Sequence, residues 1–135
     1  MKDKPFLDTN IIIYLLSADD YKADLSEQIV TRGGTVSVQV LNEFLSVATR
    51  KLGLTQQESA DVLNAVRRSC NVIPLTLETH DLGVDLIDRY GFSIYDAMIV
   101  AAALTSGAKT LYSEDMQNGL LVDNCLRIVN PYATR

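Results

Sequence analysis

Histidine, cysteine and tryptophan are scarce in this chain, and each scarcity narrows the chemistry. The 135 residues include no tryptophan, one histidine and two cysteines. The single histidine, His80, excludes a histidine-rich zinc site, and a Ser-His-Asp triad would have to use it without any local signature in support. Cys70 and Cys125 lack metal-ligand spacing, so we expect two reduced, interior thiols.

Long hydrophobic runs are also missing. The apolar run near the N-terminus covers only residues 11–16 and follows Asp8 and Asn10, which does not resemble a signal peptide. No segment approaches the roughly 20 apolar residues that a membrane-spanning helix needs. We therefore expect a soluble, cytoplasmic protein that does not associate with membranes.

Positive charge is in short supply. The chain has 12 basic and 17 acidic residues, a formal net charge of −5. This disfavours a protein that holds nucleic acid through overall positive charge, but not an enzyme that recruits divalent cations to a cluster of acids. The pairs Arg50-Lys51 and Arg67-Arg68 could flank an RNA groove. We prefer a simpler interpretation, because cations near helix C-termini interact favourably with the helix dipole.

The remaining composition predicts one compact domain over residues 1–135. The chain is 47% hydrophobic, enough for a core of its own. Hydrophobic periodicity and turn residues predict strands at 5–7, 35–38, 71–73, 110–112 and 126–129. The predicted helices cover 11–16, 22–33, 39–51, 55–69, 76–90 and 93–104. Strands that alternate with helices predict an α/β fold with a mainly parallel central sheet and helices on both faces.

One carboxylate stands in a helix that is apolar on every side. Asp96 lies near the start of the helix predicted at 93–104, which we expect to be buried all round. Because an unpaired buried charge is very costly, Asp96 needs a backbone amide, a basic side chain or a metal ion as its partner. Ser93 and Asp96 have the spacing of a capping box, although Glu or Gln is usual at the second position. A functional role is therefore preferred over a cap alone.

Two further acids follow predicted strands. Asp8 ends the first strand, and Asp115 lies just beyond the strand at 110–112. In open parallel sheets, ligands bind outside the carboxyl ends of the strands, so these acids can converge there. Each also has a capping explanation of about equal weight: Asp8 for a helix that begins near Thr9, and Asp115 for a turn through Met116.

Glu43 completes a set of four acids. On its predicted helix, Glu43 lies beside Val40 and Val47 at the edge of the apolar face. Taken alone, it would be interpreted as a residue on the solvent-exposed flank of the helix. Carboxylates held close together raise one another's pKa unless a cation neutralises them. Ligation by oxygen alone suits Mg²⁺ or Mn²⁺, which can activate water for phosphodiester hydrolysis.

Four segments together resemble the PIN-domain ribonucleases, and above all the VapC-type toxins of toxin–antitoxin pairs. They are residues 6–11, 40–44, 93–99 and 111–116, which hold Asp8, Glu43, Asp96 and Asp115. The resemblance extends from Phe6 to about Val129, in the family's order and at its usual length. It implies a PIN-like domain that acts as a Mg²⁺- or Mn²⁺-dependent endoribonuclease on single-stranded or structured RNA.

The resemblance also assigns roles. The four acids would be catalytic, with Asp8, Asp96 and Asp115 as metal ligands. Thr9 and Asn10 would support Asp8. Ser113 stands where the family often has threonine, a change that keeps the hydroxyl. The residues that bind the substrate are not implied.

Other implications concern the fourth acid and the partners. Glu114 and Asn118 lie near Asp115 in sequence, and either could assist it. In this family an antitoxin blocks the acidic pocket, often through an inserted arginine, and the domain commonly forms a homodimer.

Two alternatives have less support. A non-catalytic PIN-like module that binds RNA or a protein would not need all four acids. A haloacid-dehalogenase phosphatase needs a second aspartate two residues after the nucleophile, where Asn10 stands. A response-regulator receiver needs an acid pair after its first strand, which is not evident.

Overall fold

A six-stranded sheet forms the centre of the molecule. The computed structural model describes residues 4–133. The strands are β1 (Phe6–Leu7), β2 (Thr35–Ser37), β3 (Asn71–Ile73), β4 (Thr110–Tyr112), β5 (Leu121–Val122) and β6 (Leu126–Val129). Their order is β3-β2-β1-β4-β6-β5, and every neighbouring pair is parallel except β5 with β6. The predicted, mainly parallel sheet is confirmed.

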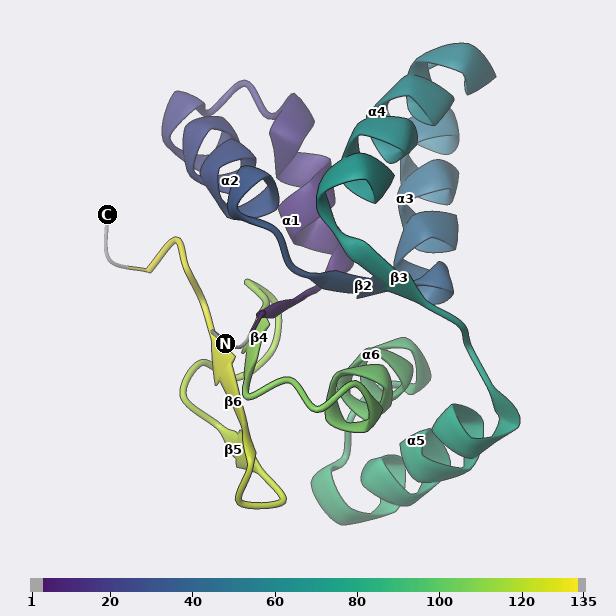
Figure 1. The fold of residues 1–135 in the computed structure, drawn as a ribbon, viewed down its shortest axis with the longest axis vertical. Coiled ribbons are helices and arrows are strands. Elements are labelled where there is room, and N and C mark those ends of the chain that lie inside the picture. The colour runs from purple at the N-terminus through teal and green to yellow at the C-terminus, as the bar shows by residue number, and fades with distance from the viewer. Residues whose placement is uncertain (1–3, 134–135) are drawn as a thin grey trace.

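Helices cover both faces of this sheet. They are α1 (Thr9–Ile13), a 3₁₀ turn (Tyr14–Leu16), α2 (Asp20–Arg32), α3 (Val38–Arg50), α4 (Gln56–Ser69), α5 (Leu77–Tyr90) and α6 (Ile94–Thr105). In Figure 1, α1 to α4 lie on one side of the sheet and α5 and α6 on the other. A chain that alternates strand and helix buries apolar side chains on both faces in this way.

Helix α6 is the most deeply buried helix, but not along its whole length. Every residue from Ala97 to Ala103 is buried. The first turn differs: Ile94 is 51% exposed and Tyr95 is 63% exposed. The prediction that this helix is buried all round is therefore wrong at its first turn, which reaches the surface and leaves Asp96 half-buried.

Local hydrogen bonds explain the other differences from the predicted elements. Val38 begins α3 rather than ending a strand, because the Ser37 hydroxyl accepts from the amide of Val40 as an N-cap. The helix predicted at 11–16 divides into α1 and the 3₁₀ turn, and its last residue, Leu16, is 40% exposed. Strand β5 was not predicted.

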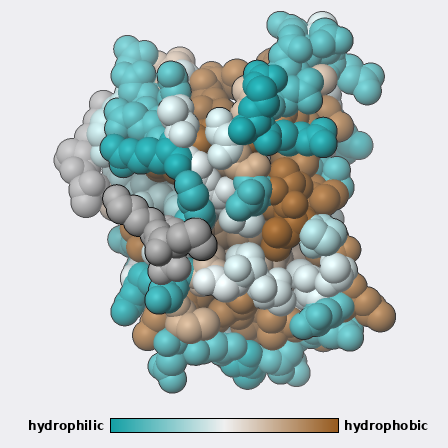
Figure 2. Space-filling view, viewed as in Figure 1, coloured by the Kyte–Doolittle hydropathy of each residue, from teal (hydrophilic) through white to brown (hydrophobic). Residues whose placement is uncertain are grey.

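One of the two cysteines that were expected in the interior lies at the surface. Cys70 is buried as predicted, whereas Cys125 is exposed, and both thiols are free. The prediction of two interior thiols is wrong for Cys125, because it lies in the turn that joins β5 to β6. Apolar atoms also gather at the surface over β3, the edge strand of the sheet (Figure 2). Within residues 4–133, no helix is both long and apolar enough to cross a membrane.

Candidate active site

Asp8 and Ser113 meet where two neighbouring strands end. Strands β1 and β4 pair in parallel, so both end at the same edge of the sheet, and the amide of Asp8 donates to the carbonyl of Tyr112 at 3.0 Å. The Oδ1 atom of Asp8 accepts from the amide of Thr9 at 2.6 Å, which confirms the predicted helix cap. The other oxygen, Oδ2, accepts from the hydroxyl of Ser113 at 2.7 Å.

The carboxyl group of Asp8 is buried among other acids. Only 5% of the residue is exposed. Burial raises the pKa of Asp8 to about 7, and the charges of Asp96 and Glu43 add to this, against the lowering effect of the hydrogen bonds from Ser113 and Thr9. Near neutral pH this group exchanges a proton readily, and a nearby cation would hold it ionised.

Glu43 and Asp96 share the electrostatic environment of Asp8. Burial is the main cause that raises the pKa of Glu43, and the charge of Asp96 raises it further. The pKa of Asp96 is also raised, first by burial and then by the charge of Asp115. All four predicted acids therefore lie close enough to influence one another, although they come from α3, α6 and the ends of β1 and β4. Glu43 is half-buried, which argues against its interpretation as a fully solvated residue.

Gln39 holds Glu43 in place and was missed at the level of sequence. Its Nε2 donates to Oε2 of Glu43 at 3.2 Å and to the carbonyl of Tyr95 at 3.1 Å, which links α3 to the first turn of α6. The signal was present, because an amide four residues before a carboxylate on a helix lies on the same face.

Asp96 has a partner in its own turn. Its amide donates to the Ser93 hydroxyl at 3.3 Å, and the side-chain hydrogen bond with Ser93 opposes the rise of its pKa. Among the described residues no salt bridge reaches Asp96. Of the three partners considered for this carboxylate, a basic side chain is therefore excluded within residues 4–133.

Asn10 supports Asp115 rather than Asp8. Its Nδ2 donates to Oδ2 of Asp115 at 3.1 Å, and its Oδ1 accepts from the amide of Glu114 at 3.4 Å. The turn after β4 is capped by Ser113, whose hydroxyl accepts from the amide of Met116 at 3.3 Å. The capping explanation for Asp115 therefore does not hold, because the neighbouring serine occupies that role.

Glu114 and Asn118 bind elsewhere. Glu114 forms an ion pair of 2.8 Å with Lys22 and accepts a hydrogen bond from the hydroxyl of Tyr14. The ammonium of Lys22 also lies 4.5 Å from the centroid of the Tyr14 ring. Asn118 accepts from the amide of Asn130 at 2.8 Å. Both side chains fasten the segment that carries Asp115 to the rest of the fold.

The donors at this edge fit a hydrated divalent cation. Within the described residues, no three His, Cys, Asp or Glu side chains form a ready-made metal cage. Mg²⁺ does not require one, since it usually keeps several waters and binds one or two carboxylates. The buried hydroxyl of Thr9 makes no hydrogen bond of ordinary geometry to the described residues, although its side chain lowers the pKa of Glu43. It is therefore available to a water molecule of such an ion.

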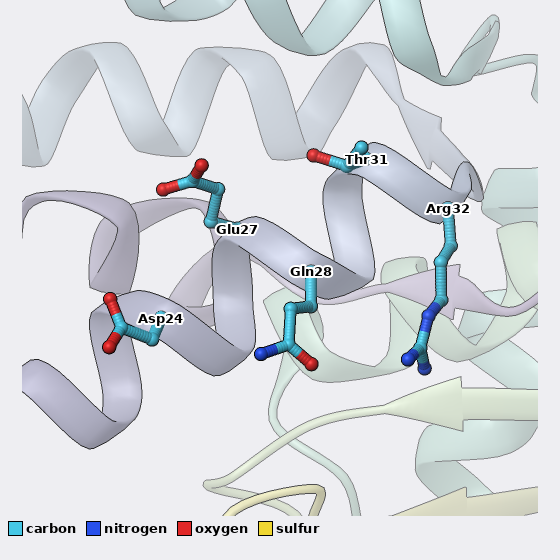
Figure 3. A pocket seen from close by; sticks show the side chains of 5 residues that line it. All are labelled: Asp24, Glu27, Gln28, Thr31 and Arg32. Carbon is cyan, nitrogen blue, oxygen red and sulfur yellow. The ribbon is translucent and has the colours of Figure 1, made fainter.

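Two depressions of similar size differ in their relation to the acids. One of about 490 Å³ is lined by Gln39, Asn42, Glu43, Ser46, Val47, Lys51, Leu75 and Tyr95, and so includes one of the four acids. The other, of about 440 Å³, is lined by Asp24, Glu27, Gln28, Thr31 and Arg32. Figure 3 shows these five side chains diverging along α2 alone, so they build no convergent site.

Comparisons with known proteins identify one family and several solved structures of similar fold. The sequence profile of the PIN domain matches residues 6–117. A comparison with curated proteins finds no match. A chain of a toxin–antitoxin complex from Klebsiella pneumoniae is similar in structure, with a TM-score of 0.72, 21% identity, and coverage of 96% of this chain and 98% of that chain.

Two other solved structures are similar as well. The Mycobacterium tuberculosis toxin VapC20, which cleaves the Sarcin-Ricin loop, has a TM-score of 0.67 and 20% identity over 83% of this chain and 90% of its own. VapBC2 from Rickettsia felis, bound to a DNA fragment from its promoter, has a TM-score of 0.64 and 20% identity over 91% of this chain and 95% of that chain.

Proposed function

This chain belongs to the PIN domain family, and we propose that it is a metal-dependent endoribonuclease and the toxin of a toxin–antitoxin pair. Its substrate is single-stranded or structured RNA, and its reaction is phosphodiester hydrolysis. The observation that carries the proposal is the state of Asp8: a buried carboxyl group with a pKa of about 7, in the field of Asp96 and Glu43. Such an arrangement is unfavourable for folding alone and useful for holding a cation.

In this proposal Asp8, Asp96 and Asp115 hold Mg²⁺ or Mn²⁺. The bound ion supplies activation of water and stabilisation of charge on the phosphate and the leaving oxygen. Ser113 and the amide of Thr9 fix both oxygens of Asp8, and Asn10 fixes Asp115. These contacts preorganise the ligands before the ion or the RNA arrives.

Glu43 has a different role, as the acceptor of a proton. Its raised pKa and its hydrogen bond from Gln39 suit a group that takes a proton from the attacking water. The water oxygen forms a bond to phosphorus while the bond from phosphorus to the leaving ribose oxygen breaks. A net charge of −5 is compatible with RNA because the cation bridges acidic site and acidic substrate.

The partners in this proposal are a small antitoxin protein and a second copy of the chain. Support for the antitoxin comes from the similar folds of chains in a toxin–antitoxin complex and in VapBC2, and the second copy is an implication of the family resemblance. Because those sequences are only 21% and 20% identical to this chain, the identity of the antitoxin has to come from experiment.

The test is cleavage of labelled single-stranded RNA with Mg²⁺ or Mn²⁺, and again with EDTA. We expect Asp8→Asn and Asp96→Asn to abolish cleavage while circular dichroism shows an intact fold. Asp88→Asn, the same change at an exposed position on α5, is the matched control and should remain active. Cleavage that persists in EDTA, or in both variants, would contradict the proposal. RNA binding without any cleavage would favour a non-catalytic module instead.

A further inference from the structure

The pocket of about 490 Å³ beside Glu43 has a lining that matches one kind of ligand. We propose that it binds an unstacked nucleobase of the RNA strand, next to the phosphate at the acidic cluster. Tyr95 is the stacking platform, Asn42 and Ser46 contact the edge of the base, and Lys51 contacts a neighbouring phosphate. This inference rests on the proposed function and names the substrate subsite that serves it.

The pocket and the acidic cluster are continuous. Glu43, one of the four acids, lines the pocket. Tyr95 lines the same pocket and directly precedes Asp96 in the chain. A base in the pocket is therefore attached to a backbone that passes the acids, which is the geometry that a nuclease subsite requires.

Tyr95 is anchored through its backbone and free at its ring. Its carbonyl accepts the hydrogen bond from Gln39, whereas the residue as a whole is 63% exposed. Because tyrosine has only two side-chain torsions and the Tyr95 backbone is already fixed, stacking of a base on the exposed ring costs little conformational freedom. Sequence-tolerant stacking of this kind is how many proteins hold single-stranded nucleic acid.

The polar groups of the pocket divide into occupied and available ones. Both donor positions of the Gln39 amide are directed at Glu43 and at Tyr95. Asn42, one turn before Ser46 on α3, is exposed, and neither side chain forms a hydrogen bond within residues 4–133. Amide and hydroxyl groups can pair with the hydrogen-bonding edge of a base.

The charges of the lining favour RNA over a second copy of this chain. Glu43 and Lys51 stand in one pocket with opposite charge, and Lys51 forms no salt bridge to a described residue. Cores of interfaces between proteins are depleted in charged residues. A lysine close to a ring and an amide instead matches a base with its attached phosphate.

The experiment measures RNA affinity separately from cleavage. The Asp8→Asn protein, which we expect not to cut RNA, is titrated into labelled single-stranded RNAs of uniform A, C or U, with fluorescence anisotropy as readout. Adding Tyr95→Ala should weaken binding roughly 5- to 150-fold, the range seen for loss of a stacking ring. Tyr95→Phe should restore the affinity and Tyr95→Leu should not. Leu121→Ala, an exposed apolar position on β5, is the control that should change nothing.

The polar residues have their own signatures. Asn42→Ala should reduce the differences in affinity among the three RNAs, because it removes the group that contacts the base edge. Lys51→Ala should weaken all three and reduce the slope of log affinity against log salt by about one. Arg32→Ala, on α2 and outside the pocket, is its control.

Several outcomes would overturn the inference. If Tyr95→Ala leaves the RNA affinity unchanged, or if Tyr95→Leu binds RNA as tightly as Tyr95→Phe, Tyr95 does not act as a stacking platform. A change in sedimentation of Tyr95→Ala at constant RNA affinity assigns the pocket to an interface between copies. If the wild type fails to cleave RNA while Asp8→Asn binds it through Tyr95, the proposed nuclease function fails and the pocket stands. If wild-type cleavage is normal and the Tyr95 substitutions leave RNA affinity unchanged, the proposed nuclease function stands and the proposed base pocket fails.

Discussion

The Ser113 hydroxyl donates a 2.7 Å hydrogen bond to Oδ2 of Asp8, although the two residues are 105 positions apart in sequence. The same hydroxyl accepts from the amide of Met116, which fixes the turn that carries Asp115. One buried side chain therefore joins the ends of β1 and β4 and positions two of the four acids. Its chemistry can be tested without altering any carboxylate.

Ser113→Ala should shift the pH dependence of RNA cleavage to higher pH. The hydrogen bond from Ser113 lowers the pKa of Asp8, so its loss raises that pKa above about 7, and ionisation then requires more alkaline solution. The fold should lose about 1–3 kcal/mol because a buried acceptor loses its donor. Ser113→Thr, which keeps the hydroxyl, is the control. An unchanged pH profile for the alanine variant would separate Ser113 from Asp8.

In EDTA the protein should lose stability as pH rises from about 4 to above 7. Asp8 has a pKa of about 7 when folded and 3.8 as its ordinary value. The folded state therefore binds more protons in this window, and that stabilisation is lost as pH passes through the folded pKa. Because the pKa values of Glu43 and Asp96 are also raised, Asp8→Asn should reduce this slope without abolishing it, with a gain of up to about 4 kcal/mol near pH 8. Urea unfolding at several pH values measures it, and parallel curves for both proteins would refute it.

Mn²⁺ should stabilise the wild type near pH 8. Binding to the folded state alone adds about 2.7 kcal/mol when the free ion reaches a hundred times its dissociation constant. The increase in melting temperature should disappear in Asp8→Asn and Asp96→Asn and remain in Asp88→Asn. An equal increase in all four proteins would indicate non-specific binding of the ion.

Gly83→Ala should weaken the contact between α5 and α6. A Cβ at this position would lie 2.6 Å from Cε and 2.9 Å from Sδ of Met98. We expect a loss of about 1–3 kcal/mol from overpacking, partly offset by the better helix propensity of alanine. In the Met98→Ala background, Gly83→Ala should cost less stability than in the wild type. Chemical unfolding of the four proteins of this double-mutant cycle measures the difference. Strictly additive effects would mean that Met98 already accommodates the extra carbon.

The sequence was sufficient to predict five of the six strands and the element that carries or precedes each acid. At Asp8 the capping and the functional interpretations did not exclude each other, because a carboxylate has two oxygens: one caps α1 and the other meets Ser113. Strand β5 was missed because two residues carry no periodic pattern, and its turn relies on Asp123 and Asn124 at φ of 51° and 56°.

Other features depend on tertiary placement. An all-apolar helix predicts burial on every side, but it does not say which turn passes the edge of the sheet, so the exposure of Tyr95 was not foreseen. The family resemblance implied that Asn10 supports Asp8, yet its side chain contacts Asp115 across 105 positions. Distant pairs of this kind follow from strand order, which local pattern does not determine.

Strand β1 lies between β2 and β4, and this order has a consequence for biosynthesis. A ribosome delivers Asp8 long before its neighbours Asp96 and Ser113, the second of which lies 105 positions further along the chain. Nascent chains fold as their segments appear, so the acids stay apart until the fourth strand leaves the exit tunnel. A polypeptide that ends before Ser113 lacks the assembled acidic cluster altogether. The proposed hydrolytic activity therefore requires a chain that extends past Ser113, which is also the first form that an inhibitor of the acidic cluster could bind.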